Sequence, residues 1–314
     1  MVALLAVWVA LFHFLGNSTL GYVNTRSLYG WFFWVHTRGA EDPVDKSIDF
    51  GKMLNDEEFH AWLIPFVVLG LLWHKREELI SMPKRVWWPA VGLLLMGILL
   101  HVVGYMVQQA RISVVGMFVG LYGLTGLFWG APWLRLSLFP FSLLLFCVPL
   151  GNAAEALTFP LRMMATNVTA VFCHTVLGIN VIQTGAQLSD SAGNYHYEVA
   201  AACSGIRSLT AIIAFGVIYS YLTFGTMWRR LLTLAAAFPL AIIANVFRLV
   251  LIIVAAEAFG QKAGNYVHES TWFSLAPYVP AIGGMLLLGV LLREKRRPSA
   301  DAQSVPLKEI ESTP

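Results

Sequence analysis

Three side chains of the kinds used in acyl transfer stand in the second half of this chain: Cys203, Arg248 and His268. Cys203 follows the polar segment 183–198 and precedes the nearly uncharged run 209–224. This pattern predicts a thiol at the N-terminus of an apolar helix, near a membrane surface. The free amide groups and the dipole at a helix N-terminus favour the thiolate, which is the nucleophilic form of cysteine.

The residues after Cys203 favour a substrate site. Ser204 and Gly205 are small enough for a substrate backbone to approach the thiol, and Arg207 shares the helical face of Cys203 because it lies four residues further on. A structural interpretation stays open, in which the cysteine is a small packing residue and Arg207 an anchor at the membrane interface.

Arg248 lies inside the apolar stretch 241–256. A guanidinium in such a stretch is costly, and it usually lines a polar cavity or pairs with a specific partner. Asn245 precedes it by three residues on the same face and can orient it. The alternative is an arginine that extends to the outer headgroups of the bilayer.

His268 is the candidate general base. It stands in the segment 260–270, which we expect to form a short polar loop on the same side of the membrane as Cys203. A loop histidine can also be merely solvated. His196 and His60 compete for the same role.

The composition identifies the class of protein. Of the 314 residues, 57% are hydrophobic and 12% charged, whereas about 25% are charged in ordinary soluble domains. The chain is therefore expected to be an all-α polytopic membrane protein, and its net charge of +3 is too small to indicate a nucleic-acid surface. Cys147, Cys173 and Cys203 form no disulfide framework, and the first two are expected to be packing residues. Neither a metal nor a cofactor is expected.

Apolar runs long enough to cross a bilayer, about 20 residues each, predict about eight transmembrane helices. They cover residues 2–23, 59–73, 87–107, 113–130, 134–150, 204–224, 231–259 and 271–292. The run 157–177 contains Pro160, Arg162, Asn167 and His174, so we expect an interfacial or re-entrant helix there.

The basic residues predict the orientation of these helices. They cluster in alternate connections and after the last helix: Lys75, Arg76, Lys84, Arg85, Arg135, Arg229, Arg230, Arg293, Lys295, Arg296 and Arg297. Positive charge favours the cytoplasmic side, so both termini are expected in the cytoplasm of a cell with Cys203, His268 and the outer end of the Arg248 helix outside the plasma membrane.

The outer segment 181–198 has the alternation of a β-hairpin, with turn residues at 189–194. It leads directly to Cys203. Residues 1–297 are expected to form one membrane domain, and residues 298–314 a disordered cytoplasmic tail because they are polar and contain Pro298 and Pro306.

Taken in order and spacing, the run from Ala202 to Leu209, the run from Asn245 to Arg248, and His268 resemble the exosortase/archaeosortase family of membrane transpeptidases. The resemblance covers about residues 59–292. The segment 56–73 is similar to the second membrane segment of the family, but its Phe-His-Ala-Trp departs from the usual form and leaves the role of His60 open.

The resemblance implies a membrane cysteine transpeptidase or peptidase, with Cys203 as nucleophile and Arg248 and His268 as its catalytic partners. Its substrates would be exported, membrane-anchored proteins with a C-terminal sorting signal, which combines a short motif (often Pro-Glu-Pro), a transmembrane helix and a basic cluster. Such an enzyme forms a thioester and transfers the substrate to an acceptor.

Two other classes remain. A transporter would also place charge in the membrane, but it usually has two matching halves with broken helices, and none are visible in this sequence. A non-catalytic membrane scaffold would need neither Cys203 nor Arg248.

Overall fold

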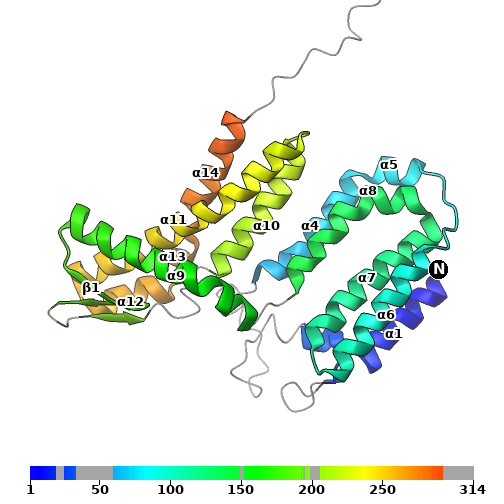
Figure 1. The fold of residues 1–314 in the computed structure, drawn as a ribbon, viewed down its shortest axis with the longest axis horizontal. Coiled ribbons are helices and arrows are strands. Elements are labelled where there is room, and N and C mark those ends of the chain that lie inside the picture. Colours follow the sequence, from blue (N-terminus) through cyan, green and yellow to red (C-terminus); the bar gives the residue numbers. More distant parts are fainter. Residues whose placement is uncertain are drawn as a thin grey trace, which may run out of the picture.

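The computed structural model describes residues 1–18, 25–32, 59–148, 152–191, 193, 195–198 and 206–292. This part of the chain is mostly helical and carries one small three-stranded sheet (Figure 1). The expectation of a helical protein with a small β element is confirmed.

The N-terminal half is built from helices. They are α1 (Val2–Phe14), α4 (Phe59–His74), α5 (Arg76–Ser81), α6 (Ala90–Met106), α7 (Ala110–Trp129), α8 (Ala131–Ser142) and the 3-10 helix η1 (Leu143–Cys147). α6 and α7 pack closely against each other. A Cβ atom on Gly97 would lie 2.7 Å from the Gly116 carbonyl oxygen, and one on Gly116 would lie 2.6 Å from the Gly97 carbonyl oxygen. The two backbones therefore touch, as small residues allow between membrane helices.

The C-terminal half is arranged around one long helix, α11. Its elements are α9 (Asn152–Phe172), the π-helical turn η2 (Cys173–Leu177), α10 (Ile206–Thr223), α11 (Met227–Phe259), α12 (Gln261–Glu269), α13 (Thr271–Leu275) and α14 (Tyr278–Leu291). α11 contacts α9, α10, α12 and α14. Figure 1 shows α9 crossing α11 close to the sheet, whereas α10 and α14 run along α11.

The sheet consists of β1 (Val181–Thr184), β2 (Gln187–Asp190) and β3 (His196–Glu198). All pairs are antiparallel, with Gln183 opposite Leu188 and Leu188 opposite Tyr197. The predicted turn near 189–194 is present between β2 and β3. A second, two-residue turn at Gly185 adds a strand that the sequence analysis had included in a single hairpin arm.

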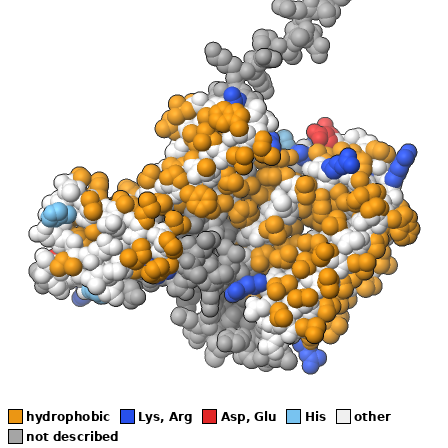
Figure 2. Space-filling model, in the orientation of Figure 1, with side chains coloured by type: hydrophobic (Ala, Val, Ile, Leu, Met, Phe, Trp, Pro, Cys, Tyr) orange, Lys and Arg blue, Asp and Glu red, His pale blue; other side chains and the backbone are white. Residues whose placement is uncertain are grey.

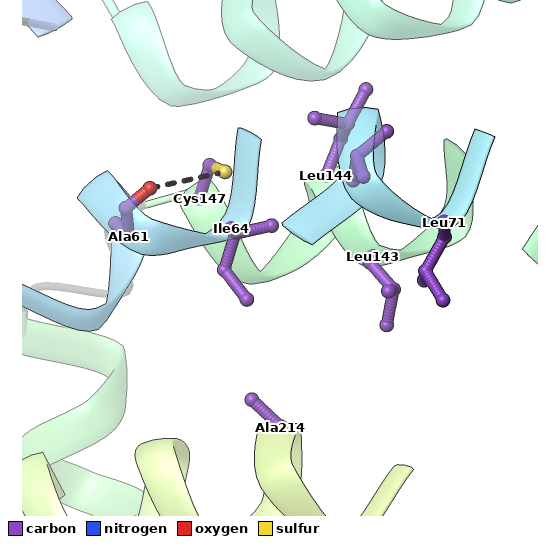
Figure 3. Packing of buried hydrophobic residues seen from close by; sticks show 8 residues of the cluster. Ala61, Ile64, Leu71, Leu143, Leu144, Cys147 and Ala214 are labelled. Carbon is purple, nitrogen blue, oxygen red and sulfur yellow. Dashed lines mark hydrogen bonds between the residues drawn. The ribbon is translucent and has the colours of Figure 1, made fainter. Parts of the chain in front are cut away.

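Among the described residues, the halves meet at a buried apolar cluster and at a polar and aromatic contact. In the first, shown in Figure 3, α4, η1 and α10 share a buried cluster, in which the Cys147 thiol donates to the Ala61 carbonyl oxygen over 3.5 Å and Ala214 packs from α10. In the second, Lys75 donates to the Tyr221 hydroxyl over 2.7 Å, and the Tyr221 ring stacks on Phe139 with centroids 3.5 Å apart.

Several predicted helix boundaries are wrong. α1 ends at Phe14 instead of continuing to residue 23, and Asn17 donates to the Thr25 carbonyl oxygen, so the chain folds back there. The last predicted helix, 271–292, is two helices, because Pro277 has no amide hydrogen with which to continue α13 and instead precedes α14. By contrast, α9 runs through Pro160 without a break.

Two helices of the described part, Ala110–Trp129 and Met227–Phe259, are long and apolar enough to cross a membrane. Six shorter apolar helices of 10–17 residues accompany them, so a count of eight spans stays a prediction. Hydrophobic side chains cover much of the visible surface (Figure 2). The basic ends of α4 and α11 lie together: Lys75 bonds Tyr221, and Arg230 donates to the Phe224 carbonyl oxygen over 2.8 Å. The expected tail, 298–314, lies outside the described residues.

Candidate functional site

The nucleophile candidate and its small neighbours, Cys203, Ser204 and Gly205, lie outside the residues that the structure describes. In the sequence they fall between the end of β3 at Glu198 and the start of α10 at Ile206. Arg207 is the second residue of α10, and its side chain is not described. The place of the thiol at a helix N-terminus therefore stays a prediction.

Arg248 lies in the second half of α11, among apolar residues as expected, and its side chain is half-buried. One terminal guanidinium nitrogen donates to the main-chain carbonyl oxygen of His268 over 3.4 Å, and Nε is fully buried. Asn245, one turn earlier on the same helix, is only 4% exposed. The structure thus brings the arginine candidate and the histidine-bearing segment together, although 20 residues separate them in the sequence.

His268 is not in a loop, which corrects the expectation. It is the penultimate residue of α12. The polar composition that suggested a loop is that of an amphipathic helix: Gln261, Lys262, Asn265 and Tyr266 are exposed, whereas Ala263, Gly264, Val267 and His268 are buried or half-buried. These two sets alternate with the helical period, so α12 places His268 on its inner face.

The sheet packs on α11 beyond Arg248. Leu188 of β2 and Tyr195, which directly precedes β3, share a buried cluster with Leu249 and Ile253 of α11. Tyr195 is only 1% exposed, and burial raises the pKa of its hydroxyl, with a further increase from the Glu257 carboxylate. The hydroxyl is therefore protonated at neutral pH. The sheet, α11 and α12 form one packed unit around Arg248.

A polar helical face to which the sequence assigned no role lies on α9, which packs against α11. Arg162, Thr166 and Thr169 follow one another at helical spacing on α9 and are all buried, Arg162 to 7% exposure. At the two ends of this face, Leu161 packs against a buried cluster that includes Ala244, and Cys173 shares a buried cluster with Leu249. The spacing of these three polar residues, four and then three positions apart, was the sequence pattern that could have indicated a shared helical face.

The competing residues are placed differently. Cys147 and Cys173 are fully buried, and burial raises the pKa of the Cys173 thiol to about 11. His196 is exposed on β3, and the side chain of His60 is not described. Within the described ranges, no group of three His, Cys, Asp or Glu side chains could hold a metal ion.

The apolar helices and the half-buried Arg248 are those of a helical membrane protein with polar groups held between its helices. The chain belongs to the transmembrane exosortase family, whose model matches residues 52–288. This family is one of membrane transpeptidases. The chain matches no curated protein and no solved structure.

Proposed function

We propose that the protein is a cysteine transpeptidase that cleaves C-terminal sorting signals of exported proteins, with Cys203 as nucleophile and Arg248 and His268 as its partners. The observation that carries this proposal is the hydrogen bond from Arg248 to the main chain of His268. This bond brings two of the three candidate catalytic residues together in a protein of the exosortase family.

The proposed reaction has two steps. The Cys203 thiolate attacks the scissile carbonyl carbon, the peptide C–N bond breaks, and the amine leaves with a proton from His268. This step leaves a thioester. An acceptor amine or hydroxyl then loses its proton to His268 and attacks the thioester, which releases the thiolate. If water is the acceptor, the enzyme acts as an endopeptidase.

Arg248 would stabilise the thiolate or the oxyanion that develops on the carbonyl oxygen. Its guanidinium is fixed by α11 and by the His268 carbonyl oxygen, so little reorganisation is needed during the reaction. A preorganised donor of this kind lowers the barrier by about 3–4 kcal/mol in acyl-transfer enzymes. Asn245 and Arg207 are supporting residues in this proposal.

The substrates would be membrane-anchored proteins of the plasma membrane, cleaved on its extracytoplasmic side. A labelling experiment in intact cells tests this orientation. A cysteine reporter at Ser191, in the β2–β3 turn, should react with a membrane-impermeant reagent, whereas one at Ser299 should not. Reversed labelling would place the site in the cytoplasm and would contradict the proposal.

The proposed chemistry is tested by trapping the thioester intermediate. A substrate with a C-terminal sorting signal should form an adduct with the enzyme that hydroxylamine releases, because hydroxylamine cleaves thioesters. Cys203→Ala should abolish both the adduct and processing while the protein accumulates normally. Processing at a normal rate in Cys203→Ala would exclude Cys203 as the nucleophile and contradict the proposed transpeptidase.

A further inference from the structure

The first turn of α12 is bonded to β3. The Tyr197 hydroxyl donates to the Gln261 carbonyl oxygen over 3.1 Å. Burial raises the pKa of Tyr197 above its usual value, so the hydroxyl keeps the proton that it donates. This bond joins segments that are 64 residues apart in the sequence.

The approach of Tyr197 depends on a glycine of α12. Gly264 is buried against the Tyr197 ring, and a Cβ atom there would collide with the hydroxyl and lie 2.9 Å from Cζ. Gly264 precedes His268 by four residues, so both residues lie on the same face of the helix. Tyr197 therefore packs on α12 one turn before the histidine.

The last turn of α12 is bonded as well, because Arg248 donates to the His268 carbonyl oxygen. α12 is thus held at its start by β3 and at its end by α11. The sheet is itself packed on α11 through Leu188 of β2 and through Tyr195, which directly precedes β3. Tyr197 stands only six residues before Cys203, and six residues span at most about 22 Å.

We propose that Tyr197 and Gly264 are positioning residues, which fix the His268 helix to the strand that leads to Cys203. This inference rests on the proposed function. The Tyr197–Gln261 bond fixes the first turn of the His268 helix against β3, and the absence of a side chain at residue 264 makes that bond sterically possible. Misplacement of a catalytic group by about 1 Å can lower a rate by about 100-fold.

The test measures the reactivity of the Cys203 thiol as a function of pH. In a Cys147→Ala, Cys173→Ala background, the rate of alkylation of Cys203 by iodoacetamide is followed against pH. A protonated imidazole lowers the pKa of a neighbouring thiol, so His268→Ala should move the alkylation midpoint to higher pH. Tyr197→Phe and Gly264→Ala should move it in the same direction. They should also lower the rate of substrate processing by about 10-fold for the lost bond and more for the added methyl group.

Two matched variants serve as controls. Tyr266→Phe removes an exposed hydroxyl from the same helix, and Gly283→Ala adds a methyl group where no atom lies within 4 Å. Both should leave the alkylation profile and the processing rate unchanged.

The outcomes separate the two proposals. If His268→Ala raises the midpoint but Tyr197→Phe leaves it in place, the positioning role is wrong and the catalytic pair stands. If His268→Ala itself has no effect on the midpoint, the pairing of His268 with Cys203 fails. If Gly264→Ala does not accumulate, Tyr197→Phe decides alone, since it retains the ring and removes only the oxygen.

Discussion

The α6–α7 pair and the α11–α12 pair are held together in opposite ways. Between α6 and α7, Gly97 and Gly116 bring the two backbones into contact, with no side chain between them. Between α11 and α12, one long side chain, Arg248, reaches a main-chain oxygen at 3.4 Å. The first contact has no room for an added atom, whereas the second includes a polar side chain that reaches across to the neighbouring backbone.

This difference separates a structural half from a candidate functional half. Contacts between glycines are made by the backbone itself, so any substitution there acts on folding. An arginine inside an apolar helix is energetically expensive, and a protein that needed only stability would not benefit from it. Variants in the two regions should therefore differ in which property they change.

The largest effect is expected for Arg248. Arg248→Ala should lower substrate processing by about 100- to 1,000-fold, because it removes a preorganised cation from the site. Arg248→Lys should also be severely impaired, since an ammonium group does not reproduce the planar fork of a guanidinium. Processing assays with quantified membrane protein measure both. Full activity of Arg248→Lys would show that charge alone is sufficient there.

The opposite behaviour is expected for Gly116. In Gly116→Ala the new methyl group would meet the Gly97 carbonyl oxygen at 2.6 Å, so α6 and α7 must separate. We expect a loss of about 1–3 kcal/mol of stability, seen as a lower melting temperature in detergent. Gly92→Ala, where nothing lies within 4 Å, is the matched control and should be neutral. Activity per folded molecule should persist. Its loss would contradict the assignment of a purely structural role to this half.

A smaller effect is expected where the halves meet. Tyr221→Phe retains the stack on Phe139 but removes the acceptor of the Lys75 hydrogen bond. Because this bond is only partly buried, it should contribute about 1 kcal/mol. Thermal unfolding measures the loss, and processing at moderate temperature should stay normal. Strongly reduced processing would mean that the junction between the halves takes part in catalysis.

The smallest effect is expected for Cys173, which distinguishes a buried thiol from the proposed nucleophile in the same half. Its pKa of about 11 leaves it protonated at pH 8, so it should react slowly with iodoacetamide. Cys173→Ala should keep full processing and lose about 0.5–1 kcal/mol of stability, measured by thermal unfolding. Loss of processing in this variant would move the search for the nucleophile away from Cys203.

Composition and periodicity predicted the helical class and the β element beside the Cys203 segment. They could not predict that residues 271–292 divide at Pro277, because other helices of this chain, such as α9 with Pro160, continue through a proline. Whether neighbouring groups compensate for the missing amide hydrogen depends on tertiary packing.

The site residues were predicted from their types and order, and their catalytic roles stay a prediction. Arg248 and His268 were paired by charge, order and expected side of the membrane, and the structure places them in contact. The helical state of α12 was missed because its polar residues masked a 3.6-residue period. The contact between Tyr197 and Gly264 joins two segments that are distant in the sequence, and no local sequence pattern predicts it.

The acceptor of the Arg248 hydrogen bond is a main-chain oxygen, which every amino acid carries. A substitution at position 268 therefore does not delete that acceptor, and the cation and the imidazole can be varied independently. Chemical complementation becomes feasible on this basis. His268→Gly would keep the guanidinium anchored while it vacates the volume of the imidazole ring, and free imidazole supplied in solution could then take the place of the missing base.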